Sequence, residues 1–507
     1  MEQVSKGRIA KNTVFLYFRM LFVMAVSLYT SRVILEILGV DDFGIYQTVG
    51  GIVGMLTFIN SALSTGTSRF ITFELGKNDI RSLTTTFSTT VTMQLFLILL
   101  IVIVAETAGV WFVNHKLQIP EGSRQPALWA YHLSIATTAF SLLSVPYLAS
   151  IIAHERMNLF AYLGIYEVCA KLGIVYLLTL SDINRLVFYA LLLLLVQISV
   201  TTFYIIYCIR KFKECRCRLI FDRDTFRQIA GFSGWSLFSS TSIALNNQGV
   251  LVLLNMFFSP AVVTARAISL QVNNAANQFV SNFRTAVNPQ IIKQYAAGNY
   301  DESKALLLSS TKYSFYMMFL LSLPICIGAE PLLHVWLKDV PDYAVIFLQL
   351  VVIQSLFQVF DTSFYTALYA KGDLKANALI SPTVGFVMFP VVYLLFKWGA
   401  SPVALSWASL VMYAILGLII KPILIVKIVN YNWKEIFDVY KPCILISVVS
   451  GTLTYLLTRQ IDDTGFAGLC AMTAISLGIS IPTIYFLGLT KSMREKLISV
   501  ALSRLKK

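Results

Sequence analysis

ELGKNDIRSLTTTFSTT, residues 74–90, recurs in altered form as AAGNYDESKALLLSSTK, residues 296–312, at an offset of 222. A second pair follows at an offset of 217: YLASIIAHERMN before IVYLL in 147–178, and FYTALYAKGDLK before VVYLL in 364–395. Self-similarity at these distances indicates that the chain is built from two related halves.

The composition is that of a membrane protein. Of 507 residues, 57% are hydrophobic and 13% are charged, and the mean hydropathy is +0.72. A water-soluble chain of this length needs more polar surface. Because the basic N-terminus MEQVSKGRIAKN leads straight into the first apolar run, we predict that this helix is retained and not cleaved as a signal peptide.

The apolar runs predict an all-α polytopic fold. A helix needs roughly 20 apolar residues to cross a hydrocarbon core of about 30 Å. Membrane barrels show alternating segments instead of continuous runs, so we expect no strands. The fourteen predicted spans are 13–38, 44–68, 85–112, 127–152, 159–181, 186–209, 229–258, 262–287, 312–336, 343–369, 376–397, 402–426, 441–458 and 466–488.

The distribution of Lys and Arg along the chain predicts its orientation in the membrane. With the N-terminus inside, most of the 40 Lys and Arg residues fall in the inner segments, among which we count Lys421 and Lys427. The positive-inside rule then places both termini of this multi-pass membrane protein in the cytoplasm. The net charge of +14 suits anionic lipid headgroups and not nucleic acid. The seven cysteines show no metal-binding spacing.

The repeat predicts the domain organisation. We expect an N-terminal six-helix bundle in 1–209, a basic cytoplasmic linker in 210–228, a C-terminal six-helix bundle in 229–427, and two further helices with a basic tail in 428–507. Halves with an even number of helices share one orientation, which implies a pseudo-two-fold axis along the membrane normal. Such parallel duplication is typical of secondary transporters that work by alternating access.

A polar stripe marks the predicted span 262–287. Its residues recur at three- and four-residue steps and share one helix face. They are Arg266, Asn273, Asn277, Ser281, Arg284 and Asn288. Ionisable residues within a span are expensive and mark functional candidates. We favour the wet, cationic wall of a cavity; the alternative is a stripe buried between helices and satisfied by its neighbours.

Other ionisable candidates lie in three more predicted spans. Arg19 and Arg32 in the first span are about 140° apart on an ideal helix, so they face one partner only if the helix bends. Arg32 with Glu36, and Glu167 with Lys171, have the spacing of ion pairs along a helix.

Asp361 lies deep in the predicted span 343–369 and has no partner at helical spacing. It is therefore a candidate for coupling transport to a proton or cation gradient.

Three segments carry a resemblance to a known family. They are SRVILEILGVDDFGIYQ (31–47), GTSRFITFELGKND (66–79) and PLLHVWLKDVPDYA (331–344). The chain resembles the Wzx-type oligosaccharide and polysaccharide flippases of the multidrug/oligosaccharidyl-lipid/polysaccharide (MOP) exporter superfamily, relatives of the lipid II flippase and of MATE transporters. The likeness extends over nearly the whole chain.

The resemblance implies a flippase that moves undecaprenyl-pyrophosphate-linked repeat units of O-antigen lipopolysaccharide, capsule or exopolysaccharide from the inner to the outer leaflet. It implies substrate binding by Arg19, Arg32, Arg266 and Arg284, and we add Asn273 and Asn277 from the same stripe. Glu36, Glu167, Lys171 and Asp361 remain candidates for coupling or for ion pairs. We expect no enzymatic activity, metal or cofactor, and coupling to an H⁺ or Na⁺ gradient. Expected partners are a polysaccharide polymerase and glycosyltransferases. The last two helices resemble the pair that forms a lipid-tail groove in the lipid II flippase.

Two alternatives stay open at this point. A MATE-like cation-coupled drug exporter shares the architecture, although such exporters favour carboxylates in the cavity, where this chain has Arg. A membrane-embedded glycosyltransferase or polymerase would use Asp41 and Asp42, but the predicted outer loops are too short to build a sugar site.

Overall fold

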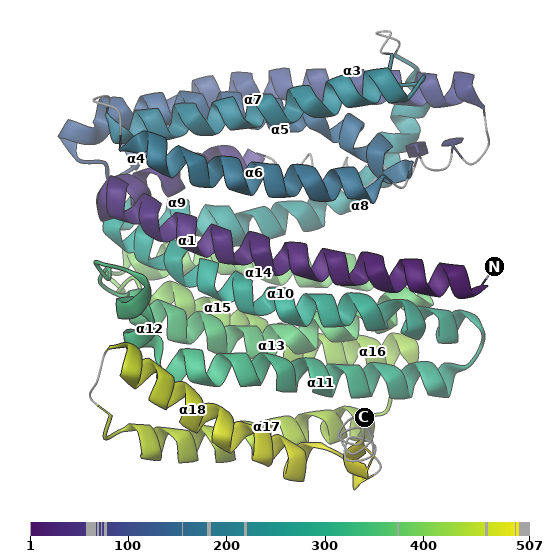
Figure 1. Cartoon of the computed structure of the whole chain (residues 1–507), viewed down its shortest axis with the longest axis vertical. Coiled ribbons are helices and arrows are strands. Elements are labelled where there is room, and N and C mark those ends of the chain that lie inside the picture. Colours follow the sequence, from purple (N-terminus) through teal and green to yellow (C-terminus); the bar gives the residue numbers. More distant parts are fainter. Residues whose placement is uncertain are drawn as a thin grey trace. The chain divides into compact units, whose positions relative to one another are not determined.

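The computed structural model describes residues 2–56, 67, 70–71, 74–75, 79–154, 156–179, 184–216, 221–372, 375–461, 465–491 and 493–495. Within these ranges, side chains are described except at 2–20, 157–158, 160–161, 228–237, 239 and 286. The secondary-structure elements of the described residues are all helices, with no strand among them (Figure 1). The predicted all-α fold is confirmed. Contacts divide the chain into two compact units, residues 1–267 and 268–507, and each is considered by itself.

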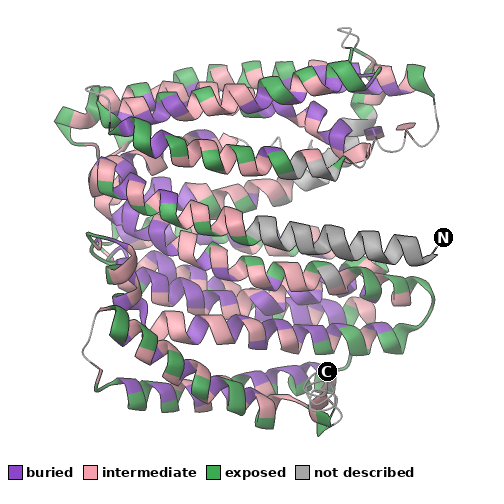
Figure 2. Ribbon diagram, in the orientation of Figure 1, coloured by how far each residue is buried: buried purple, intermediate pink, exposed green. Residues whose placement is uncertain are grey.

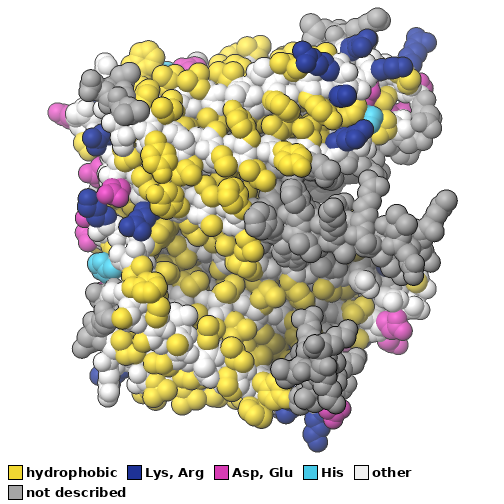
Figure 3. All heavy atoms as spheres, in the orientation of Figure 1, with side chains coloured by type: hydrophobic (Ala, Val, Ile, Leu, Met, Phe, Trp, Pro, Cys, Tyr) yellow, Lys and Arg dark blue, Asp and Glu magenta, His cyan; other side chains and the backbone are white. Residues whose placement is uncertain are grey.

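The helices have the surface of membrane spans. Ten helices in the described ranges are long and apolar enough to cross a membrane, and each falls on predicted spans; the total of fourteen stays a prediction. Hydrophobic side chains cover the middle of the helices, and charged ones gather near helix ends (Figure 3). The helices carry exposed residues along their length and not only at their ends (Figure 2). On α3 (Ile80–Val104), Phe96, Leu99 and Ile103 are exposed, as expected for side chains that face lipid instead of water.

The first unit begins with a helix in two parts. Gly39 in α1 has non-helical φ 81° and ψ 170°, a conformation open to glycine and strained for other residues. The two parts of α1 therefore meet at the turn that the sequence placed between the first two spans. The elements of this unit are α1 (Glu2–Leu56), α3 (Ile80–Val104), η1 (Ala105–Gly109), α4 (Val110–Lys116), η2 (Glu121–Ser123), α5 (Arg124–Ala153), α6 (Met157–Leu178), α7 (Arg185–Lys211), α8 (Arg223–Ala244), η3 (Leu245–Gly249), α9 (Val250–Phe257) and the start of α10 (Pro260–Ala296).

The basic segment after α7 folds back onto the end of α5. The Phe212 ring stacks on His154 at a centroid distance of 3.9 Å, and the buried Glu214 carboxylate lies 2.5 Å from His154 Nε2. Cys208 and Cys215 are buried beside this contact and are free thiols. The predicted linker 210–228 is thus anchored to the first unit at its beginning. The contact division places α8 and α9 with this unit, whereas the predicted second bundle starts at 229; the six-plus-six division stays a prediction.

The second unit contains the helices that follow in the chain. They are the rest of α10, α11 (Tyr300–Ile327), α12 (Ala329–Trp336), α13 (Ala344–Lys371), α14 (Lys375–Lys397), α15 (Ala404–Ile415), η4 (Leu416–Ile420), α16 (Lys421–Val429), α17 (Trp433–Thr458), α18 (Phe466–Thr483) and η5 (Ile484–Gly488). Predicted span 312–336 is interrupted at Gly328, between α11 and α12.

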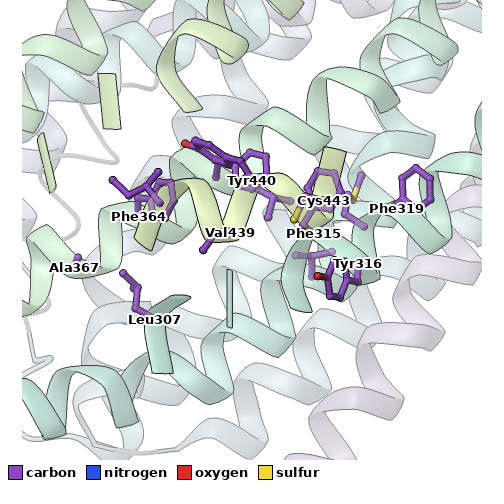
Figure 4. Packing of buried hydrophobic residues seen from close by; sticks show 14 of the residues in the cluster. Leu307, Phe315, Tyr316, Phe319, Phe364, Ala367, Val439, Tyr440 and Cys443 are labelled. Carbon is purple, nitrogen blue, oxygen red and sulfur yellow. The ribbon is translucent and has the colours of Figure 1, made fainter. Parts of the chain in front are cut away.

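The core of the second unit joins α11, α13 and α17 (Figure 4). Phe360 stacks on Phe315 at 5.1 Å and meets the edge of Tyr440 at 4.8 Å. The Tyr440 hydroxyl donates to the Gly417 carbonyl at 2.7 Å. Lipid tails are as apolar as these side chains, so close packing and hydrogen bonds, more than the hydrophobic effect, hold α17 to the bundle.

Candidate functional site

A buried ion pair lies inside the second unit. Lys421 Nζ is 3.2 Å from Asp361 Oδ1, and the two side chains are 3% and 17% exposed. Lys421 begins α16 and directly follows the π-helical turn η4. A buried charge is tolerated only when it is paired and hydrogen-bonded, so this pair fixes α16 against α13.

Glycine allows the close approach that forms the pair. A Cβ on Gly417 would lie 2.5 Å from the Phe357 carbonyl oxygen of α13. Lys421 follows Gly417 by one helical turn, and Asp361 follows Phe357 by one helical turn. The sequence therefore brings the backbones together at Gly417 and the opposite charges together at the next turn.

The Lys421 ammonium contacts side chains of two other helices, α13 and α14. It donates a hydrogen bond to Asn377 Oδ1 on α14, which also accepts from Ser381 Oγ at 3.0 Å. It lies 5.3 Å from the centre of the Tyr365 ring on α13, within cation–π range. A carboxylate, an amide oxygen and an aromatic face thus surround one ammonium group.

The polar stripe of α10 faces α13 in this structure. Three hydrogen bonds join residues at a constant offset of 78: Asn277 Nδ2 to Ser355 Oγ at 3.1 Å, Arg284 Nη2 to the Thr362 carbonyl at 2.6 Å, and Thr366 Oγ1 to Asn288 Oδ1 at 3.3 Å. A constant offset means that the two helices run parallel and in register.

Asn273 completes this ladder. It is 5% exposed and accepts from Ser355 Oγ at 2.7 Å. From Asn273 onward, polar side chains of the stripe are therefore hydrogen-bonded to the neighbouring helix α13. This is the alternative that the sequence left open beside the cavity wall. One donor of Arg284 is unused, because its buried Nε has no hydrogen-bond partner within the described ranges. Substrate binding by Asn273, Asn277 and Arg284 stays a prediction.

The other residues predicted for binding or coupling lie outside the Asp361–Lys421 ion pair and the α10–α13 ladder. Arg266 is buried, 3% exposed, near the start of α10, and Arg32 and Glu36 are exposed on α1. Arg19 is in α1, but its side chain lies outside the described residues. The pair predicted from spacing on α6 is formed, with Lys171 Nζ 2.6 Å from Glu167 Oε1.

Lys421 is the residue that sequence reasoning missed. Its assignment to the basic inner segments is wrong, because it is 2% exposed within the second unit. Asp361, which has no partner at helical spacing, finds one on another helix. The available signal was that Lys421 lies inside the predicted span 402–426, five positions before its end.

Hydrogen bonds and a close backbone contact join four segments at the predicted outer end of the first unit. Thr264 Oγ1 donates to the Val40 carbonyl at 2.6 Å, and the Gln118 N–H donates to the Asn255 carbonyl at 3.3 Å. Gly44 is so close to the start of α10 that a Cβ there would lie 2.0 Å from the Pro260 carbonyl oxygen. The turn of α1 and the segment after α4 are thus both held against α9 and α10.

Comparisons with known proteins identify the fold. No family model matches the chain, and no curated protein does. Among solved structures, the chain is similar to an inward-facing multidrug resistance MATE transporter of the MOP superfamily, with 13% identity, a TM-score of 0.67 and coverage of 82% of this chain and 99% of that one. It is also similar to the lipid II flippase MurJ in an inward closed conformation, with 12% identity, a TM-score of 0.69 and coverage of 93% and 97%.

The chain has the MOP transporter fold. A further MOP superfamily transporter, from Pyrococcus furiosus, matches with 12% identity, a TM-score of 0.58 and coverage of 80% and 93%. The likeness to MurJ extends over more of this chain than the likeness to the MATE structure. Within the MOP fold, this chain has its buried Asp361–Lys421 pair and its α10–α13 polar ladder in the second unit.

Proposed function

We propose that the chain is a flippase that moves undecaprenyl-pyrophosphate-linked oligosaccharide repeat units from the inner to the outer leaflet. The observation that carries the proposal is the charge balance of the polar interior. The Asp361 carboxylate is paired with Lys421, and Arg284 bonds to the neighbouring residue of α13. These three side chains sum to one positive charge, which suits a pyrophosphate and disfavours a cationic drug.

The chemistry of the cargo agrees with this balance. A pyrophosphate and a polar glycan cannot cross hydrocarbon without polar partners. The planar guanidinium of Arg binds phosphate through two parallel hydrogen bonds. The unused Nε of Arg284 is available for such a bond, and Arg19, Arg32 and Arg266 are the further arginines that we assign to the headgroup path. Asn273 and Asn277 would exchange their α13 partners for sugar hydroxyls.

We assign the protein to the bacterial inner membrane with both termini in the cytoplasm. Glycosyltransferases on the cytoplasmic side would supply the lipid-linked glycan, and a polymerase on the other side would consume it. MurJ is named for a lipid-linked cargo, and its likeness covers 93% of this chain, which supports this class of substrate.

We further propose that transport is coupled to protons through Asp361. Protonation of its carboxylate would leave Lys421 without its counter-ion and Arg284 without a neighbouring negative charge. In the described part of the chain, Asp361 interacts with Lys421 on α16 and with Arg284 on α10, and Tyr365 on α13 lies beside the same Lys421 ammonium. The ammonium already occupies the carboxylate and amide oxygens that a Na⁺ ion would use, so we favour H⁺ over Na⁺.

Complementation tests the function. A strain that lacks its own flippase for a matching glycan should regain surface polysaccharide with the wild-type chain and lose it with Arg266→Ala/Arg284→Ala. Lys397→Gln, which removes an exposed cation at the end of α14, is the matched control. Full export by the double variant would refute the role of these arginines. Altered drug susceptibility with unchanged polysaccharide on deletion of the gene would instead support a MATE-like exporter.

A further inference from the structure

A pocket of about 480 Å³ opens beside the outer end of α17. Its walls come from α11, α13, α15, α17 and α18, all within the second unit. Trp407 and Tyr455 line it and are 54% and 57% exposed. It has no part in the ion pair or in the α10–α13 ladder.

The lining of the pocket combines polar, aromatic and apolar side chains. Arg459 and Thr458 at the end of α17 line it together with Trp407 of α15. Ile346 and Ile353 of α13 also line it, and seven residues of helix correspond to about 10 Å along this wall. Polar and aromatic groups beside an apolar wall match the two parts of a membrane lipid.

The charge that lines the pocket has one sign. Of the described residues that line the pocket, Arg459 alone is charged. Gln349, the amide in the wall, donates to the Cys326 carbonyl at 3.1 Å, so Arg459 is the group left to recognise an anion. Tyr455 stands one turn before Arg459 on α17, which places an aromatic ring beside the cation.

We propose that this pocket binds a resident anionic phospholipid of the outer leaflet, with its phosphate on Arg459 and an acyl chain along Ile346 and Ile353. The lipid would fill the space between α17 and the adjoining ends of α13 and α15. A resident lipid is not the transported cargo, so the proposal holds whether or not the chain is a flippase. The outer leaflet follows from the predicted orientation.

Quenching by brominated lipids tests the site. The full chain is placed in nanodiscs that contain phosphatidylcholine with either dibrominated phosphatidylglycerol or dibrominated phosphatidylcholine of the same acyl chains. Trp407→Phe is measured in parallel, so that the difference isolates the fluorescence of Trp407. We expect phosphatidylglycerol to bind about fivefold more tightly, the factor that corresponds to about 1 kcal/mol for one Arg near an anionic lipid surface.

Matched variants decide the outcome. Arg459→Gln should abolish the preference for phosphatidylglycerol, whereas Lys397→Gln, at the same predicted end of the bundle, should keep it. Equal quenching by both lipids in the wild-type chain would overturn headgroup recognition. A preference that survives Arg459→Gln would overturn the assigned residue. Neither measurement depends on transport, so failure here and failure of the proposed function are distinguishable.

Discussion

Gly44→Ala is a substitution that the first unit tolerates poorly at its predicted outer end. The added Cβ would lie 2.0 Å from the Pro260 carbonyl oxygen, 2.6 Å from its carbon and 2.8 Å from Thr264 Oγ1. Two of these atoms are backbone, so no side-chain rotation relieves the contact. The start of α10 must move away from α1, and the hydrogen bond from Thr264 to Val40 is then lost.

The magnitude follows from these two effects. Overpacking of this kind costs about 1–3 kcal/mol, and one hydrogen bond contributes about 1 kcal/mol. Together they weaken the closed contact by about 2–4 kcal/mol, which is a shift of roughly 30- to 1,000-fold in its equilibrium. The same substitution raises helix propensity by about 1 kcal/mol, so a matched control is needed.

Gly50→Ala is that control. It makes the same change later in α1, where a Cβ would meet no atom within 4 Å. The reporter is a cysteine at Asn255, a fully buried position on α9, in a chain whose native cysteines are replaced. We expect an impermeant maleimide to label it at least about 30-fold faster in Gly44→Ala than in Gly50→Ala. Equal labelling rates, with both variants monodisperse and equally heat-stable, would refute the close contact at Gly44.

Two further predictions concern stability. Lys421→Met should lower the free energy of unfolding by about 3–5 kcal/mol, because it leaves the Asp361 carboxylate buried without its partner, and Lys421→Met/Asp361→Leu should recover most of that loss; detergent-phase thermal unfolding measures both. Asp79, the N-cap of α3, has its pKa lowered from 3.8 by hydrogen bonds from Ser82, so its stabilisation is present above pH 3.8 and is lost as pH falls through the lowered pKa. The difference in melting temperature between wild type and Asp79→Ala should therefore shrink between pH 5 and pH 3, and a constant difference would contradict the cap.

Helix positions were predictable because lipid imposes a length and an apolar composition on each span. Predicted span 343–369 becomes α13, Ala344–Lys371, and predicted span 376–397 becomes α14, Lys375–Lys397. The ion pair on α6 was predictable for a similar reason, since spacing along one helix fixes which side chains meet. In each case the deciding interaction is local in the chain.

The site was less predictable because its contacts join different helices. Lys421 and Asp361 lie 60 residues apart, and their pairing depends on which helices are neighbours and on the close approach at Gly417. A lysine near the predicted end of a span looks the same in sequence whether it points to the membrane surface or into the bundle. Hydrophobicity alone carries no signal that separates the two cases.

The α10–α13 ladder reconciles the two interpretations of the polar stripe. Hydrogen bonds between helices within a membrane contribute on average about 0.6 kcal/mol each, so the three bonds at offset 78 hold the helices together by only about 2 kcal/mol. Conformations of one protein commonly differ by a few kcal/mol. Exchanging Ser355 and Thr362 for the hydroxyls and phosphates of a cargo therefore costs little. Groups that are satisfied between helices in this conformation can line a cavity in another, and burial of Asn273 or Asn277 here is no argument against a role in binding.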